Sequence, residues 1–449
     1  MTTLASPPET LDVLDPSTGE PIATVEIGDA DAAVRAARAA APAWARTAAA
    51  ERAERLKAGA RRLREHVDQL AELQSREGGK PLADSRGGIE AGIGAIEQYA
   101  ELGPLHRGKA LQGGWNATDV MVHEPRGVVA LLVPWNDPVA IACGQIAAAL
   151  VAGNAVVFKP SEKTPLSGAR IVELLDIPGG ALQLLQGDAR VGRPLAAHPD
   201  VDLVMHTGSV QTGREIADVV AGRMGKALLE LGGKDALIVD ADVDPAWAAE
   251  QAALGAYANA GQICTSVERI YVHEAVAEPF VEALARAADG WTIGPLIDAR
   301  QREVVHAHVT DAVERGARLV RGGAVPDGPG FFYPPTVLVG GDRDAPVLRE
   351  ETFGPVAAVQ VVTSFDEALA LADDTEYGLA ATVLTKNPEH AQRAVRELAV
   401  GTVKINAVFG GAPGGAAEPA RLSGSGFGYG PELLDELTRT KVVHMGIAP

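Results

Sequence analysis

The sequence predicts an α/β protein with mostly parallel sheets, and two observations support this fold class. From residue 127 onward, short runs rich in Val, Ile and Leu alternate with longer runs that have a helical pattern. Strands that alternate with helices in this way form βαβ units, in which neighbouring strands are parallel. The chain also has 449 residues, which is too long for one ordinary hydrophobic core, so two or three domains are expected.

The N-terminal part is expected to combine short strands, two helices and a hairpin. Residues 11–20 alternate into a Pro-Ser-Thr-Gly turn, and a short strand follows at 22–27. The Ala-rich stretch 29–74 has a pattern that is typical of two amphipathic helices. Alternation around Gly113 and Gly114 predicts a β-hairpin at 111–124.

The strands of the two sheets are expected to follow in chain order. The segment 410–430 is rich in Gly, Ala, Pro and Ser and is expected to be a loop, and 438–445 should form a final strand. The remaining predicted strands are 128–133, 155–158, 181–185, 203–206 and 227–230, then 236–239, 268–272, 356–362, 381–384 and 402–405.

Composition excludes several classes of protein. A formal net charge of −19 argues against nucleic-acid binding, because contacts to the phosphate backbone need clustered Lys and Arg. Two cysteines cannot form a disulfide framework, which fits a reducing compartment. The apolar runs are too short to span a bilayer, and residues 1–8 show no secretion signal. We therefore expect a globular, cytoplasmic protein without a membrane partner.

Cys264 is the strongest candidate for a catalytic residue. It follows a Gly-Gln turn, thirty-four residues after Glu230. A thiol can attack an aldehyde carbonyl and hold the product as a thioester, but with a pKa near ~8.5 it needs a base, which Glu230 could supply directly or through water. The alternative is that Cys264 is a small buried hydrophobic residue.

Four other polar groups lie next to predicted strands. Asn136 could donate to a developing oxyanion, or it could simply cap the next helix. Lys159 and Glu162 could hold a ribose, or they could lie in a solvated turn. The Thr-Gly-Ser-Val-Gln-Thr-Gly segment 207–213 could bind a pyrophosphate at a helix N-terminus, although it is not the Gly-x-Gly-x-x-Gly fingerprint. The Glu and Phe of the segment 350–355 could contact a nicotinamide nucleotide, or they could form a surface turn.

Taken together, these motifs resemble the aldehyde dehydrogenase superfamily over residues 12–443, almost the whole chain. They have the order and spacing of that family, and the Glu-Leu-Gly-Gly-Lys and Gly-Gln-x-Cys pair is highly specific to it. The matching segments are Pro134-Trp135-Asn136, Lys159-Pro160-Ser161-Glu162, Thr207-Gly208-Ser209, Glu230-Leu231-Gly232-Gly233-Lys234, Gly261-Gln262-Ile263-Cys264 and Glu351-Thr352-Phe353-Gly354-Pro355.

The resemblance implies a role for each catalytic residue. Cys264 would attack the aldehyde to form a thiohemiacetal, whose oxyanion Asn136 and the backbone N–H of Cys264 would stabilise. Loss of hydride to the nicotinamide would leave a thioester, and Glu230 would activate the water that hydrolyses it. Relatives that transfer the acyl group to coenzyme A usually lack this acid, so release of a free carboxylic acid is expected.

The resemblance also implies a nucleotide cofactor and no metal. Glu162 would take the adenosine ribose hydroxyls and repel a 2′-phosphate, so NAD is expected, with NADP also possible. We found no His/Cys cluster with the spacing of metal ligands in the sequence. The residues that match cofactor positions are Trp135, Lys159, Ser161, Glu162, Gly208, Ser209, Gly213, Leu231, Gly232, Glu351 and Phe353.

The chain departs from the family at three places. In the loop 416–428, Phe427 and Gly428 replace the usual Arg-Glu pair, so a Glu often proposed as a second proton relay is missing. His206 stands where Phe is usual, and the connection 289–295 is shorter than normal. These departures weaken any transfer of substrate specificity and lower the expected catalytic power.

Three regions are therefore expected. Residues 1–105 and 126–232 should form a Rossmann-like cofactor-binding domain, and 233–432 an α/β catalytic domain. The hairpin 106–125 and the tail 433–449 should form a small β oligomerisation element in a homodimer or homotetramer. The alternatives to NAD(P)-dependent aldehyde oxidation are a coenzyme-A-acylating enzyme, a catalytically quiet relative with a structural or binding role, and a cofactor-free Cys thioesterase.

Overall fold

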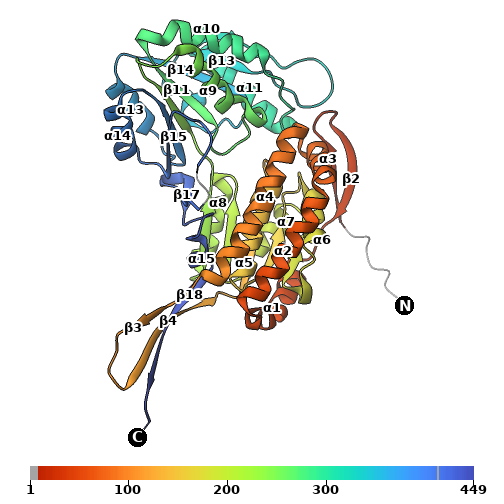
Figure 1. Cartoon of the computed structure of the whole chain (residues 1–449). Helices are drawn as coiled ribbons and strands as arrows, with labels where there is room; N and C mark the ends of the chain where they lie inside the picture. The colour runs from red at the N-terminus through yellow and green to blue at the C-terminus, as the bar shows by residue number, and fades with distance from the viewer. Residues whose placement is uncertain (1–8, 412–413, 449) are drawn as a thin grey trace, which may run out of the picture.

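The computed structural model describes residues 9–411 and 414–448. The expectation about residues 1–8 and two residues of the predicted loop 410–430 lie outside these ranges. Within them, no helix has both the length and the apolar character needed to cross a membrane. Two α/β lobes and a projecting arm of three strands make up the molecule (Figure 1). The predicted α/β fold with two mostly parallel sheets is thus confirmed.

The first sheet has six strands, and all of its neighbouring strands are parallel except one edge pair. That pair joins β17 (Gly424–Ser425), from the segment predicted to be a loop, to β9 in antiparallel register. In order across the sheet the strands are β17, β9 (Lys226–Glu230), β8 (Leu203–Thr207), β5 (Val128–Leu132), β6 (Ala155–Lys159) and β7 (Leu182–Leu184).

Helices cover both faces of this sheet because its central strands are apolar on both sides. Val129 and Leu131 of β5 pack in the core with one set of helices, and Val128 and Ala130 pack on the opposite face. The first set includes α5 (Pro138–Val151) and α6 (Pro165–Leu175), and the second includes α1 (Ala30–Arg46), α7 (Ala189–Ala197) and α8 (Val210–Gly222).

The second sheet has seven strands and is parallel except for β12 at one edge. The short strands β12 and β13 were not predicted from the sequence. Across the sheet the strands are β12 (Arg318–Arg321), β13 (Thr336–Val339), β14 (Val356–Val362), β11 (Val267–His273), β10 (Asp235–Val239), β15 (Ala380–Leu384) and β16 (Thr402–Ile405). Its helices are α9 (Pro245–Tyr257), α10 (Glu274–Gly290), α11 (Ala299–Glu314), α12 (Pro346–Arg349), α13 (Phe365–Asp373) and α14 (Pro388–Glu397).

The N-terminal region contains more helix than the sequence predicted. Two short strands, β1 (Thr10–Asp15) and β2 (Glu20–Glu26), pair as expected, but 29–74 holds three helices instead of two. The chain leaves helical geometry at Thr47–Ala48 and again at His66, so the Ala-rich stretch is divided twice. The second and third of these helices are α2 (Ala49–Glu65) and α3 (Val67–Gly78).

Helix α4 (Leu82–Leu102) was not predicted at all. Glycine is a poor helix former, and this helix contains four of them. One has a packing reason, since a Cβ on Gly92 would lie 3.1 Å from the Cα of Ala140 in α5. The two helices therefore approach closely, and tertiary packing overrides the weak local propensity.

The arm consists of β3 (Lys109–Leu111), β4 (Ala117–Pro125) and β18 (Thr438–Gly446). These strands form an antiparallel sheet in the order β18-β4-β3, and β18 pairs with β4 along its whole length. The arm projects from the body at the lower end of Figure 1, and the chain ends near its tip. The short helix α15 (Leu433–Glu436) leads into β18 at the base of the arm.

Candidate active site

Cys264 lies in a sharply turned loop between α9 and β11. Asn259, Ala260 and Gly261 all have positive φ, at 49°, 55° and 72°. At Gly261 a Cβ would overlap the carbonyl oxygen of Gly354, so the cysteine loop rests directly on the backbone of the Glu-x-Phe-Gly-Pro segment. The glycine of the Gly-Gln-x-Cys motif is therefore required both by the left-handed turn and by this close contact.

Asn136 leaves the end of β5 and reaches the cysteine loop. Its side-chain Nδ2 donates a 3.1 Å hydrogen bond to the carbonyl oxygen of Gln262, and its own carbonyl accepts a 3.1 Å bond from Nδ2 of Asn259. The residue at the N-cap of α5 is Asp137, and it makes no side-chain cap bond. The helix-cap alternative for Asn136 is therefore wrong, and its amide faces the loop that carries Cys264.

Glu230 is the last residue of β9, and its side chain is held by the loop 416–428, which departs from the family pattern. Oε1 of Glu230 accepts a 2.9 Å hydrogen bond from the backbone N–H of Gly428. Burial raises the pKa of Glu230 to about 7, against the lowering effect of this bond. The carboxyl group thus changes protonation near neutral pH, which suits a general base.

The thiol of Cys264 is protonated in the free protein. Burial, followed by the charges of Asp235, Glu230 and Glu351, raises its pKa to about 12. A half-buried thiol with this pKa is a poor nucleophile until a base removes its proton or a positive charge is bound nearby.

Cys264 and Glu230 line the same cavity, whose volume is about 640 Å³. Helices α4 and α5 supply one wall, mainly through Ala91, Ala95, Tyr99 and Ile141, and the described part of the loop 410–430 supplies another. Among the described lining residues Glu230 is the only charged one, and most of the others are small or apolar. The cavity can therefore hold a sizeable uncharged molecule next to the thiol.

Sequence reasoning missed several polar residues in this cavity, among them Gln145 and Tyr429. Gln145 of α5 donates from Nε2 to Oγ1 of Thr207 over 3.0 Å, and Tyr429 directly follows the divergent loop 416–428. Gln145 lies inside an apolar helical run, where no local pattern marks it.

The predicted cofactor residues gather at the carboxyl ends of neighbouring strands. Lys159 ends β6, Trp135 follows β5, and Gly208 follows β8, which itself lies beside β9. In open parallel sheets this edge is where ligands bind. The fold therefore brings the segments that follow β5, β6, β8 and β9 to one edge of the sheet.

The first group of these residues surrounds the end of β6. Nζ of Lys159 donates to the carbonyl oxygens of Pro160 and Gly187 at 2.7 and 2.9 Å, and burial lowers its pKa. Oγ of Ser161 accepts a 3.2 Å bond from the backbone N–H of Lys163, and Glu162 is partly exposed beside it. The carboxylate of Glu162 is therefore reachable from solvent at the sheet edge.

The second group begins helix α8. Ser209 is the N-cap, and its Oγ accepts a 3.3 Å bond from the backbone N–H of Thr212. At Gly213 a Cβ would overlap the side chain of Leu231, so α8 packs tightly against the segment after β9. A 13-residue helix that starts at a ligand-binding edge offers its N-terminal N–H groups to an anion.

The third group lies where the second lobe meets the first. The rings of Trp135 and Phe353 meet edge to face with centroids 5.4 Å apart. Oε1 of Glu351 accepts a 3.1 Å bond from the backbone N–H of Gly233, and a Cβ on Gly232 would overlap this carboxylate. Burial, with the charge of Glu268 next, raises the pKa of Glu351 to about 8. The two lobes thus meet at the residues that the sequence assigned to the cofactor.

Several solved structures share the fold of this chain over nearly its whole length. A lactaldehyde dehydrogenase from Escherichia coli is 32% identical, with a TM-score of 0.95 over 99% of this chain and 97% of that one. A betaine aldehyde dehydrogenase from Staphylococcus aureus, solved with NAD+, is 33% identical, with a TM-score of 0.94 over 98% and 92%. A 3,6-anhydro-L-galactose dehydrogenase, solved with NADP, is 33% identical, with a TM-score of 0.94 over 98% and 96%.

The sequence model of the aldehyde dehydrogenase family matches residues 3–443. This match covers nearly the whole chain, in agreement with the resemblance that the motifs indicated. The chain belongs to the aldehyde dehydrogenase family, whose enzymes are NAD(P)-dependent.

Proposed function

We propose that this protein oxidises an uncharged aldehyde to the free carboxylic acid, with NAD as the preferred cofactor. The observation that carries the proposal is that Cys264 and Glu230 line one cavity while the amide of Asn136 is tied to the loop of Cys264. A nucleophile, a base and an oxyanion donor are thereby supplied by three different loops.

The chemistry begins at the thiol. The thiol proton of Cys264 passes to Glu230, directly or through water, while sulfur bonds to the aldehyde carbon and forms a thiohemiacetal. Nδ2 of Asn136 and the backbone N–H of Cys264 stabilise the oxyanion. NAD, when bound, supplies the hydride acceptor that converts the thiohemiacetal to a thioester. Once Glu230 has released the thiol proton to solvent, it takes a proton from a second water, whose oxygen attacks the thioester carbon, and the sulfur of Cys264 leaves as a thiolate.

The polar groups at the sheet edge fit a dinucleotide. The N-terminus of α8, begun by Ser209, suits a pyrophosphate, and the carboxylate of Glu162 suits ribose hydroxyls. The same carboxylate would repel a 2′-phosphate, which supports NAD over NADP. Glu351 and Phe353 reach this edge from the second lobe and would contact the nicotinamide end.

Glu230 favours hydrolysis of the thioester over acyl transfer to coenzyme A. It also favours an active enzyme over a catalytically quiet relative with a structural role. Glu230 supplies the base that hydrolysis needs, and its pKa near 7 makes it effective at neutral pH. The divergent loop does not remove this base, since Gly428 holds it by a backbone bond. A cofactor-free thioesterase would not explain the polar groups that fit a dinucleotide at the edge of the first sheet.

The cavity supports an uncharged substrate of considerable size. A volume of about 640 Å³ exceeds what a two- or three-carbon aldehyde would fill. No Lys or Arg appears among the described lining residues, so a second carboxylate on the substrate would find no counter-ion. An aromatic or branched aliphatic aldehyde fits these walls better than an acidic semialdehyde.

Oligomerisation through the arm is the second part of the proposal. An antiparallel sheet that exposes apolar side chains is a poor surface for an isolated molecule. We propose a homodimer or homotetramer assembled by this sheet, in the cytoplasm, where the two free cysteines would stay reduced. The exposed apolar residues of the arm are Leu111, Trp115, Val442, Met445 and Ile447.

NADH absorbance over a panel of aldehydes tests the reaction. The panel spans aliphatic, aromatic, amino- and carboxy-aldehydes at saturating NAD, with NADP as a parallel series. Cys264→Ala should abolish turnover, while Cys143→Ala, a change at the other, fully buried cysteine, should leave it nearly intact. Absence of turnover across the panel in a protein that still binds NAD would favour the quiet relative, and product formation only with coenzyme A would favour acyl transfer.

A further inference from the structure

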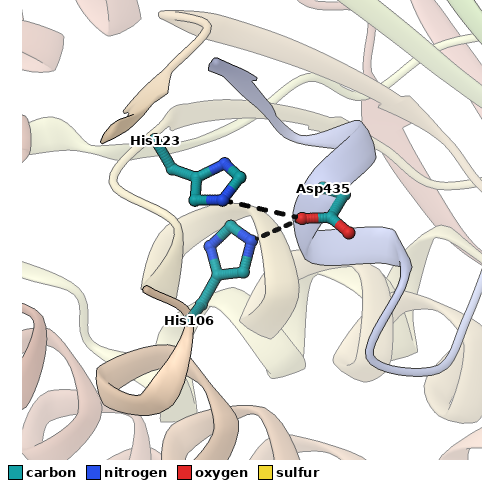
Figure 2. A group of neighbouring side chains, drawn as sticks. All are labelled: His106, His123 and Asp435. Carbon is teal, nitrogen blue, oxygen red and sulfur yellow. Dashed lines mark hydrogen bonds and ion pairs between the residues drawn. The ribbon is translucent and has the colours of Figure 1, made fainter. Parts of the chain in front are cut away.

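Three side chains with metal-ligand chemistry converge at the base of the arm. His106 follows α4, His123 lies on β4, and Asp435 lies on α15, so three separate segments supply them. One ligand atom from each lies within 4.8 Å of the other two. Figure 2 shows both imidazole rings turned toward the same carboxylate oxygen of Asp435. Nε2 of His106 lies 2.7 Å from that oxygen, and Nε2 of His123 lies 4.0 Å from it.

A threonine fixes the tautomer of His123. Oγ1 of Thr438 donates a 2.9 Å hydrogen bond to the carbonyl oxygen of Leu434, so it has to accept the 3.3 Å bond from Nδ1 of His123. Nδ1 therefore carries the proton, and Nε2 presents its lone pair toward Asp435. In this tautomer a divalent cation placed between Nε2 and Asp435 would bind to both.

The three side chains remain accessible from solvent. His106 and His123 expose 16% and 21% of their side chains and Asp435 66%, so a cation from solvent can enter and keep a water ligand.

We propose that His106, His123 and Asp435 form a binding site for Zn²⁺ or a similar borderline divalent cation. Tetrahedral zinc with bonds of about 2.0–2.1 Å holds its ligand atoms about 3.3 Å apart. The 2.7 Å separation has to widen and the 4.0 Å separation has to shorten, each by less than about 1 Å. Two imidazoles among three ligands favour zinc over Mg²⁺ or Ca²⁺, which prefer oxygen.

The bound ion would tie the arm to the body of the protein. His123 belongs to the arm, His106 to the turn after α4, and Asp435 to the helix that precedes β18. A cation at this point links all three segments and stabilises the folded state by mass action. Because these three ligands are far apart in the sequence, the spacing of metal ligands could not predict the site. Within the described residues no other group of His, Cys and acidic side chains forms such a cluster.

Zinc binding to the untagged full chain tests the proposal. Competition with a colorimetric zinc chelator is measured in a Cys264→Ala background, so that the catalytic thiol cannot bind the metal. We expect one Zn²⁺ per chain and a rise in melting temperature with added Zn²⁺. His123→Gln and His106→Gln should each weaken binding at least tenfold. Thr438→Val, which removes the partner of Nδ1 of His123 together with the bond to the carbonyl of Leu434, should weaken it by roughly tenfold.

A matched control lies on the same arm. His444 pairs with Asp119 over 2.6 Å without a third ligand, so His444→Gln should leave zinc affinity and the zinc-induced melting shift unchanged. If the Cys264→Ala protein binds no Zn²⁺, or if His106→Gln and His123→Gln bind it as tightly as the parent, the proposal is overturned. The three residues would then form only a His–Asp hydrogen-bonded network.

Discussion

The backbone N–H of Gly428 donates a 2.9 Å hydrogen bond to Oε1 of Glu230. This bond joins the segment that departs most from the family pattern to the proposed catalytic base. The same segment contains β17, which pairs with β9, the strand that Glu230 ends. The rewritten loop is thus part of the support of the active site, although it lacks the usual acidic residue.

Gly428→Ala should slow turnover by displacing this base. A Cβ at Gly428 would overlap the side chain of Glu230, and the site shows no positive φ that would add backbone strain. We expect kcat to fall by roughly tenfold or more, in line with the sensitivity of catalysis to small displacements, with little change in NAD affinity. Gly222→Ala, where a Cβ meets nothing within 4 Å, is the matched control in steady-state assays. Equal kcat values for the two variants would show that the contact does not position Glu230.

The pH dependence of turnover should report Glu230. It acts as a base only when ionised, and burial raises its pKa to about 7, so kcat should rise with pH through that value. Glu230→Gln should lower kcat by about 10²–10⁴-fold and abolish the rise near pH 7. Rate profiles between pH 5.5 and 9 measure this. A variant that keeps the same ascending limb would assign the titration to another group.

The sequence could place Asn136 and Glu230 because parallel strands bring their carboxyl ends to one edge of a sheet. Asn136 comes four residues after the end of β5 and Glu230 is the last residue of β9, and these two strands flank β8. A local pattern was therefore sufficient to predict that they lie on one edge. Cys264 comes from the second lobe, and only the family resemblance brought it to the same cavity.

The sequence could not place contacts that depend on the packing of distant segments. Helix α4 was missed because its glycines lower local helix propensity, yet it walls the substrate cavity. The bond from Gly428 to Glu230 and the approach of His106 to Asp435 each join residues about two hundred or more positions apart. No periodicity or spacing rule carries such information.

Gly261→Ala should destabilise the protein more than an ordinary substitution at positive φ. The left-handed backbone alone costs about 1–2 kcal/mol for alanine. Here the new Cβ would also overlap the backbone carbonyl of Gly354, which cannot rotate away. Gly316→Ala, with φ of 89° and open space around it, isolates the backbone cost. We expect urea unfolding to show a clearly larger loss for Gly261→Ala; equal losses would contradict the tight packing of the cysteine loop.

His206 should make stability depend on pH below neutrality. It lies on β8, is 92% buried, and has no well-formed hydrogen bond to either ring nitrogen. Burial lowers its pKa to about 4, and the backbone of Leu132 offsets this only in part. The folded protein therefore binds this proton less readily than the unfolded chain, whose histidine has a pKa near ~6.5.

The sign of the effect follows from this difference. Between pH 6.5 and 4 the unfolded chain holds more protons, so the free energy of unfolding falls as pH falls through this window and levels off below it. Between pH 8 and 5 the loss that His206 causes should be about 2 kcal/mol. His206→Phe, the residue usual in the family, should remove this loss, and His206→Gln should remove it too while lowering stability at every pH. Urea unfolding at pH 8 and pH 5 compares the three proteins, and equal pH dependence in all of them would mean that His206 is protonated freely in the folded state.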